Sequence, residues 1–179
     1  RSMRPRLRHR QRPRPSNSYD EDADPGAREL PEFERNDVRR AAMNLLARRE
    51  YGRAELSARL AGKGMPESLV AEVLDELAAE GLQSDIRFAE AFVQARAGRG
   101  QGPVRIRMEL ERRGVSSGTL ENALEDCEID WPALAGTVRR KRFGGSRPGD
   151  FRERARQMRF LQYRGFTADH IRGAVGDDD

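Results

Sequence analysis

The spacing of apolar residues predicts an all-α protein. From Asp37 onward, apolar side chains recur three and four positions apart, which places them along one face of a helix. The first such stripe follows Asp37, a favourable N-cap residue, and comprises Val38, Ala41, Ala42, Leu45 and Leu46. Similar stripes continue to Val175 and are interrupted by glycine, proline and capping residues, so we expect a succession of short helices.

The interruptions predict where these helices begin and end. Ser84, Asp130 and Thr167 precede apolar stripes and are expected to be N-caps, whereas Pro103 suits the first turn of a helix. The segment GGSRPGD at 144–150 separates two further helices. In the helices that follow Ser84 and that segment, the residues expected to face the core are Ala89, Phe92, Val93, Phe151, Ala155, Met158 and Leu161.

A short basic helix that ends in glycine occurs three times. ELSARLAGKG (55–64), RIRMELERRG (105–114) and RQMRFLQYRG (156–165) each have a leucine four residues before the final glycine and a base directly before it. The glycines, Gly64, Gly114 and Gly165, stand 50 and 51 residues apart. Glycine adopts the left-handed conformation of a helix C-cap at low cost. Apolar residues recur one, six and ten positions after each glycine, so the repeating unit has three helices and about 50 residues.

These units predict the domain organisation. Residues 37–82, 83–128 and 129–176 form repeats 1, 2 and 3. Units of this size bury little surface alone, so we expect the repeats to support one another in an elongated, curved array.

The two ends of the chain lack helical periodicity. Residues 1–36 include seven arginines within 1–15, and eight acids lie within 20–37, so we expect a disordered N-terminal tail. This tail either contacts nucleic acid or is a solvated leader. Arg1 and Ser2, before Met3, look like a cloning remnant, and 177–179 form an acidic tail.

Composition narrows the class of protein. The chain is 36% charged, 36% hydrophobic and 6% aromatic, which suits small helical units with charged outer faces. Cys127 is the only cysteine, so neither an intrachain disulfide nor a thiolate metal cluster can form. No apolar run approaches the ~20 residues of a membrane span, and no signal peptide is visible. We expect a cytoplasmic monomer without cofactor, metal or membrane contact.

The chain offers little for catalysis. His9 and His170 have no second histidine or cysteine at metal-ligand spacing, and Cys127 lies on an apolar stripe without a histidine partner. GRGQGP at 98–103 suggests a phosphate loop, but a helix rather than a strand precedes it. We interpret it as a turn between two helices. The alternative is that the start of the next helix holds one phosphate with the help of the flanking bases Arg99, Arg105 and Arg107.

Charge is divided among the helices. Residues 66–85 contain six acids and no base, 121–130 contain five acids and no base, and 139–164 contain ten bases with only two acids. Two adjacent basic helices without compensating acids favour a surface for a polyanionic or acidic partner over a merely solvated face. The candidate binding residues are Arg139, Arg140, Lys141, Arg142, Arg152, Arg156, Arg159, Tyr163 and Arg164, together with Arg99, Arg105 and Arg107.

The sequence resembles the RecX family of recombination regulators. The resemblance rests on ARREY-x-RAEL, GL-x-SD-x-RFAEAFV and GP-x-RI-x-x-EL-x-x-RGV within residues 45–115, and on MRFLQYRGF-x-x-x-x-I near the end. It covers roughly residues 38–175 and leaves out the N-terminal tail. The resemblance implies three tandem three-helix repeats in a bacterial cytoplasmic protein that acts in homologous recombination, DNA repair and the SOS response.

The partner implied by the resemblance is the RecA recombinase. Members of the family lodge in the groove of the RecA–single-stranded-DNA filament and hinder its growth or promote its disassembly. They thereby lower ATP hydrolysis, strand exchange and assistance to repressor cleavage. The family offers no catalytic motif to transfer, and the binding residues named above come from charge and helix position alone.

Two other classes of function remain open at this stage. Small three-helix units can act as helix-turn-helix readers of DNA, but the basic helices lack a clear set of Asn and Gln side chains for reading bases. Nonspecific contact with single- or double-stranded DNA can accompany filament binding. A purely structural scaffold would not need the concentration of bases in repeat 3.

Overall fold

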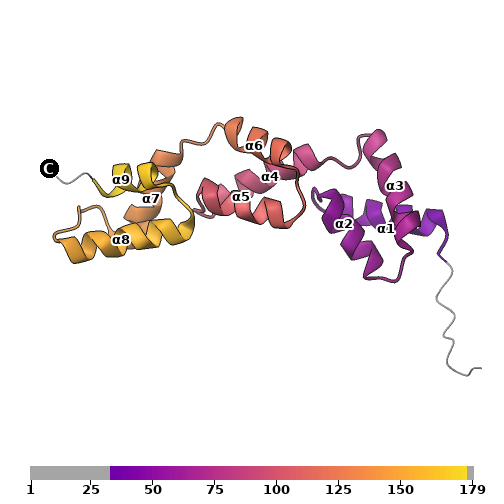
Figure 1. Ribbon diagram of the computed structural model, residues 1–179, viewed down its shortest axis with the longest axis horizontal. Coiled ribbons are helices and arrows are strands. Elements are labelled where there is room, and N and C mark those ends of the chain that lie inside the picture. Colours follow the sequence, from indigo (N-terminus) through magenta and orange to yellow (C-terminus); the bar gives the residue numbers. More distant parts are fainter. Residues whose placement is uncertain (1–32, 177–179) are drawn as a thin grey trace, which may run out of the picture. The chain divides into compact units, whose positions relative to one another are not determined.

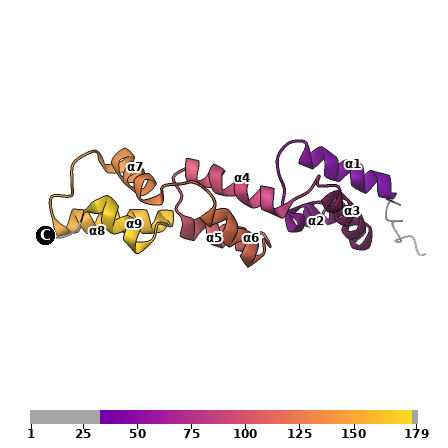
Figure 2. The same ribbon diagram turned by 90° about the horizontal axis from the view of Figure 1, so that it is seen from above.

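The computed structural model describes residues 33–176, which form nine α-helices and no β-strand. Each repeat contributes three successive helices, as Figures 1 and 2 show from two directions. The prediction of an all-α protein with three tandem three-helix units is therefore confirmed. In chain order the helices are α1 (Arg35–Leu46), α2 (Arg53–Ala61), α3 (Glu67–Ala79), α4 (Asp85–Gly98), α5 (Pro103–Arg112), α6 (Ser117–Glu125), α7 (Trp131–Phe143), α8 (Phe151–Arg164) and α9 (Ala168–Val175).

Each repeat has its own apolar core. The first is centred on fully buried leucines and valines of α1, α2 and α3, and the second on the equivalent side chains of α4, α5 and α6. The third is smaller and includes Ala135, Leu161 and Phe166. Trp131, at the start of α7, packs against both the second and the third core.

The repeating glycines end their helices in the left-handed conformation, as predicted: Gly165 is the C-cap of α8, Gly114 follows the C-cap of α5, and Gly64 lies two residues beyond the C-cap of α2. Gly64, Gly114 and Gly165 have φ of +84°, +77° and +90°, which is the left-handed region that favours glycine. In each repeat the amide after the glycine donates to the carbonyl of the leucine four residues before it. These bonds measure 3.3 Å for Met65 to Leu60, 3.2 Å for Val115 to Leu110 and 3.2 Å for Phe166 to Leu161. The side chains of all three leucines are fully buried.

The helix starts agree with the sequence except at α1. Side-chain oxygens of Ser84, Asp130 and Thr167 accept backbone N–H groups in the first turns of α4, α7 and α9, so these predicted N-caps are confirmed. At α1 the N-cap is Glu34, and the expected cap Asp37 lies three residues inside the helix. The Asp37 carboxylate instead accepts the amide of Glu34 at 3.2 Å, which forms a capping box.

The burial of two phenylalanines differs from the prediction. Phe151 was expected to face inward but is 83% exposed, because it is the first residue of α8 and lies before the part of the helix that reaches the third core. Phe88 is buried in the second core and was missed, whereas its neighbour Phe92 is only partly buried. The predicted inward residues Ala89 and Val93 are fully buried.

Hydrogen bonds join successive repeats. The first amide of α2, that of Arg53, donates to Asp85 Oδ1 at 2.7 Å, so the start of α4 caps the start of α2. The end of α8 meets the start of α5, where the amides of Gly102 and Val104 donate to the carbonyls of Arg164 and Gly165 at 2.9 and 3.0 Å. Neighbouring repeats therefore satisfy each other's helix ends.

Candidate binding surface

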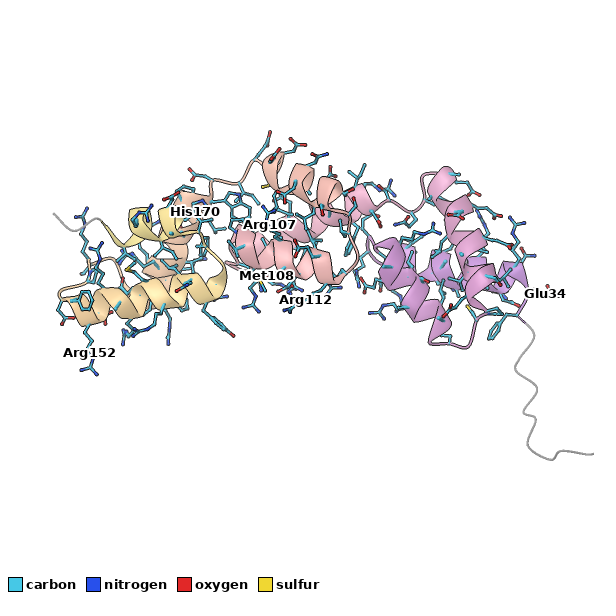
Figure 3. The ribbon with its side chains drawn as sticks, in the orientation of Figure 1. Glu34, Arg107, Met108, Arg112, Arg152 and His170 are labelled. Carbon is cyan, nitrogen blue, oxygen red and sulfur yellow. The ribbon has the colours of Figure 1, made fainter. Side chains whose placement is uncertain are left out.

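The predicted arginine stripe on α8 is exposed, but its members differ. Arg152 and Arg159 extend into solvent and have no ion pair with any described carboxylate, and Figure 3 shows Arg152 projecting from the start of α8. Arg156 pairs with Glu153 at 3.1 Å, and its guanidinium lies 5.1 Å from the centre of the Phe143 ring. The stripe thus presents two unpaired cations and one held against an aromatic ring.

The basic run on α7 does not share one face. Arg139 is only 5% exposed, so its assignment to the binding surface is wrong. Its Nη1 donates to the Ser146 carbonyl at 3.0 Å and to Gln157 Oε1 at 3.3 Å. The cause is the helical period, which turns one of four consecutive residues inward, between α7 and α8. Arg139 holds the loop between these helices in place.

The rest of the run is exposed and lies beside bases from other helices. Lys141 and Arg142 line a hollow of about 380 Å³ that also includes Arg99, from the end of α4, and Arg164, from the end of α8. Arg164 Nη1 donates to the Arg99 carbonyl at 3.3 Å, which fixes one wall of the hollow. Arg140 is exposed as well and donates to Thr137 Oγ1 at 3.0 Å. The fold therefore brings together candidate residues that are 65 positions apart in the sequence.

A second hollow adjoins the first. It has a volume of about 410 Å³ and is lined by Arg142, Phe143, Arg156 and Phe160, so it shares Arg142 and Phe160 with its neighbour. The two phenylalanine rings meet edge to face with centres 5.3 Å apart. The Arg164 guanidinium lies 5.5 Å from the Phe160 ring centre. Sequence reasoning missed both phenylalanines because it assigned functional roles by charge.

The start of α5 is not a phosphate site. Its amides at Gly102 and Val104 already donate to the carbonyls at the end of α8, so the phosphate hypothesis for this helix start is wrong. Two of the three bases expected to assist are also engaged, because Arg105 Nε pairs with Glu109 at 3.2 Å and Arg107 pairs with Glu121.

Tyr163 lies in a different hollow. The residue is 75% exposed, and the Arg105 guanidinium lies 5.5 Å from the centre of its ring. Hydrogen bonds with Glu109 and Tyr163 raise the pKa of Arg105 above its ordinary value. This hollow of about 250 Å³ also includes Val104, Met108 and Arg112, and Figure 3 shows the last two on one side of α5. Val104 and Met108 are four residues apart and therefore lie on one face of α5, whereas Ile106 and Leu110 lie on its buried face. This apolar pair outside the core stripe is the sequence signal that could have identified the hollow.

The residues considered for catalysis occupy structural positions. Cys127 is buried in the second core, and its thiol lies 3.0 Å from the Leu124 carbonyl oxygen. His170 is half-buried and accepts the Thr167 amide through Nδ1 at 3.4 Å, and burial lowers its pKa. His9 lies outside the described residues. Within 33–176 no three histidine, cysteine or acidic side chains gather in a way that could hold a metal ion. No helix in this range is long and apolar enough to cross a membrane.

Family models match all three repeats. The model described as RecX, first three-helix domain, matches residues 39–77, the second-domain model matches 84–124, and the third-domain model matches 128–175. The matches follow the order of the repeats along the chain.

Curated relatives and solved structures agree with these matches. The chain is 54% identical to the regulatory protein RecX of Halorhodospira halophila over 142 residues, which cover 79% of this chain and 88% of that protein. It is 50% identical to the regulatory protein RecX of Pseudomonas savastanoi pv. phaseolicola over 145 residues, which cover 79% and 94%. The crystal structure of RecX from Lactobacillus salivarius aligns with a TM-score of 0.67 at 22% identity and covers 79% of this chain and 94% of that one. This last similarity supports the fold.

Proposed function

The chain belongs to the RecX family of regulatory proteins, and we propose that it regulates RecA by binding the RecA–single-stranded-DNA filament. Bound there, it limits filament growth or promotes disassembly, and so lowers ATP hydrolysis, strand exchange and repressor cleavage. The observation that carries the proposal is the family match over every repeat in chain order. An array of repeats presents a longer contact surface to a filament than a single three-helix unit does.

The charge of repeat 3 supports a contact with this filament. Lys141, Arg142, Arg152 and Arg159 are exposed and have no described acidic partner, so their charge is available to a polyanion or an acidic groove. We further propose that the protein is a cytoplasmic monomer and a binding protein rather than an enzyme. On this account its effect on ATP hydrolysis arises from the RecA subunits that it prevents from assembling.

Titration into RecA filaments tests the proposal. With RecA assembled on single-stranded DNA, we expect ATP hydrolysis to slow at amounts well below one molecule per RecA subunit, because one block affects many subunits. Filament length, followed by electron microscopy, should fall over the same range. The protein alone should hydrolyse no ATP. An unchanged ATPase rate at equimolar protein would contradict the proposal.

A second candidate function is nonspecific binding of nucleic acid. The adjoining hollows of repeat 3, where bases alternate with phenylalanine rings, favour this alternative. It predicts inhibition that disappears when excess free single-stranded DNA is added, because the protein would act by occupying DNA. Filament regulation predicts inhibition that persists.

A further inference from the structure

A groove crosses α5, α8 and α9 where repeats 2 and 3 meet. It consists of the hollow that contains Tyr163 and a neighbouring hollow of about 470 Å³, which share Val104 and Gln162. We call this surface the α5–α9 groove. Its apolar lining comes from both repeats and comprises Val104, Met108, Met158, Tyr163, Phe166 and Ile171.

The α5–α9 groove gathers apolar surface that folding leaves uncovered. Within 33–176 six large apolar side chains are exposed, and three of them, Val104, Met108 and Tyr163, line this groove. Phe166 and Ile171, which belong to the third core, line it as well. Apolar surface concentrated in one depression is typical of a protein-binding site, and methionine side chains adapt to the shape of a partner.

The charges around the groove favour an acidic ligand. Glu109 is the one carboxylate in the lining, and it is shared between Arg105, at 3.2 Å, and Arg96, at 3.0 Å. One positive charge is therefore left over at this cluster. Arg112 also lines the groove, is exposed and has no ion pair among the described residues, whereas Arg172 pairs with Asp169 of its own helix. A carboxylate that binds beside Arg105 and Arg112 would be attracted by both.

The lining favours a protein segment over a nucleic-acid strand. A strand binds through phosphates on many cations and through bases stacked on exposed rings. Tyr163 is the one exposed ring in this lining, and most of the other apolar side chains are aliphatic or thioether groups. An amphipathic peptide segment, with apolar residues on one side and acids beside them, would use both the apolar lining and the cations.

We propose that the α5–α9 groove binds a short acidic, amphipathic segment of RecA and so provides a contact with the protein part of the filament. The inference rests on the proposed function, which supplies RecA as the partner. It adds the surface that meets RecA and the chemistry of the segment bound there. The bases of α7 and the α8 stripe are not part of this contact.

A matched pair of neutral substitutions tests the groove without changing net charge. The test variant is Met108→Ser/Tyr163→Ser, and the control is Leu82→Ser/Ile86→Ser, which shortens two exposed apolar side chains near the junction of repeats 1 and 2. The test variant should need at least about tenfold more protein for half-maximal inhibition of RecA ATP hydrolysis, because an apolar contact is lost. The control should stay within about threefold of the parent. Circular dichroism and thermal melting check that both are folded.

A binding measurement without RecA separates a protein ligand from nucleic acid. The probe is a fluorescent oligothymidylate of about 16 nucleotides, followed by anisotropy with the full chain. The Met108→Ser/Tyr163→Ser variant should have the same affinity for this probe as the parent, within about twofold, because the groove contacts protein.

A zero-length cross-link tests for the carboxylate. Arg112→Lys keeps the positive charge and supplies a primary amine, which a carbodiimide joins as an amide to a carboxylate in direct contact. The parent chain has only two lysines, Lys63 and Lys141, so few other amines compete. In complexes with RecA filaments we expect Arg112→Lys to be joined to a RecA peptide in which apolar residues lie beside the acids. The control Arg48→Lys, at an exposed position of repeat 1, should be joined much less. Mass spectrometry identifies the peptide.

Three results would overturn the inference while leaving the proposed function in place. The first is equal inhibition by Met108→Ser/Tyr163→Ser and its control. The second is a parallel loss of oligothymidylate binding by the test variant, which would identify the ligand as nucleic acid. The third is cross-linking to RecA from Arg48→Lys but not from Arg112→Lys. Failure of the parent itself to slow RecA ATP hydrolysis would instead remove the proposed function, and this inference with it.

Discussion

Repeats 1 and 3 share one backbone design and use their charges differently. In repeat 1, α3 and its C-cap residue Glu80 supply acids to the arginines of α1 and α2, as in the pairs Arg39–Glu80 at 2.6 Å and Arg53–Asp75 at 2.7 Å. In repeat 3, the corresponding last helix, α9, has one acid, Asp169, and that acid pairs with Arg172 of the same helix. The bases of α7 and α8 consequently face few described acids.

The comparison distinguishes charges that are neutralised within the protein, in repeat 1, from charges that remain available to a partner, in repeat 3. Exposed ion pairs stabilise a protein by well under about 1 kcal/mol each, so pairing in repeat 1 mainly neutralises its surface. The unpaired bases of repeat 3 leave a positive field that can attract an anionic partner from a distance. The same three-helix unit can therefore serve as a neutral support at one end of the array and as a charged surface at the other.

The largest effect is expected at the repeating glycines, where the two repeats can be compared directly. Gly64→Ala and Gly165→Ala both place a side chain at positive φ, which costs about 1–2 kcal/mol. A Cβ at Gly64 would lie 3.8 Å from Phe33, whereas a Cβ at Gly165 would lie 2.3 Å from the Cβ of Arg105 and 2.6 Å from its backbone nitrogen. We expect Gly165→Ala to cost about 3 kcal/mol or more and to separate repeats 2 and 3. Urea unfolding measures both, and equal costs would show that the junction adjusts freely.

Reversing exposed charge should affect the two repeats unequally. Arg152→Glu/Arg159→Glu in repeat 3 reverses two exposed charges that have no ion pair with a described carboxylate. It should raise the concentration for half-maximal inhibition of RecA ATP hydrolysis at least about thirtyfold, because attraction becomes repulsion. Arg48→Glu/Lys63→Glu in repeat 1 makes the same change in net charge and should raise it less than about threefold. The ATPase assay across a salt series measures this difference. Equal inhibition by the two variants at low salt would show that the α8 stripe is a solvated face.

Single substitutions at Arg139 and Arg39 compare a buried arginine of repeat 3 with an exposed, ion-paired arginine of repeat 1. Arg139→Ala removes a buried guanidinium and leaves the Ser146 carbonyl and Gln157 Oε1 without this donor, at a cost of about 1–2 kcal/mol. Arg39→Ala breaks an exposed pair with Glu80 and should lower the melting temperature less than Arg139→Ala does, because solvent screens exposed ion pairs. Thermal unfolding compares the two variants. If Arg39→Ala is the more destabilising, the ion pairs of repeat 1 contribute more to folding than we infer.

The sequence predicted the scaffold well because the scaffold depends on local rules. A glycine after a basic last turn, as at Gly64 and Gly165, or a serine before an apolar stripe, as at Ser84, fixes a helix end through bonds within a few residues. The three cores follow from the same periodicity. Only the cap of α1 was misplaced, by three residues, because Glu34 and Asp37 can both accept the amides there.

The candidate surface was harder to predict, because it depends on which side of a helix meets another repeat. Consecutive bases look equivalent in sequence, yet Arg139 is buried and Lys141 is exposed. Arg99 joins Arg164 only because the end of α4 meets the end of α8, a contact between residues 65 positions apart. Long-range contacts of this kind leave no periodic signal in a single sequence.

The smallest effect expected is a dependence on pH that belongs to repeat 1. Burial raises the pKa of Glu55, but hydrogen bonds and charges from Arg49, Arg59 and Arg113 outweigh it, so the pKa lies below the ordinary value of 4.5. A lowered pKa means that the stabilisation is complete above about pH 4.5 and is lost as the pH falls through the folded-state pKa. The free energy of unfolding of Glu55→Gln should therefore be lower than that of the parent at pH 7, by less than about 1 kcal/mol. At pH 3 the two free energies should be nearly equal.

The control for this pH dependence is Glu111→Gln, which alters an exposed carboxylate that has no ion pair among the described residues. It should leave the melting temperature close to that of the parent at both pH values. Because no carboxylate of repeat 3 receives three arginines in this way, acid should loosen repeat 1 before repeat 3 through this cluster. Hydrogen exchange at pH 3 would then report faster opening of α2 than of α8. A difference between Glu55→Gln and the parent that persists unchanged at pH 3 would assign the stabilisation to packing of the Glu55 side chain instead of its charge.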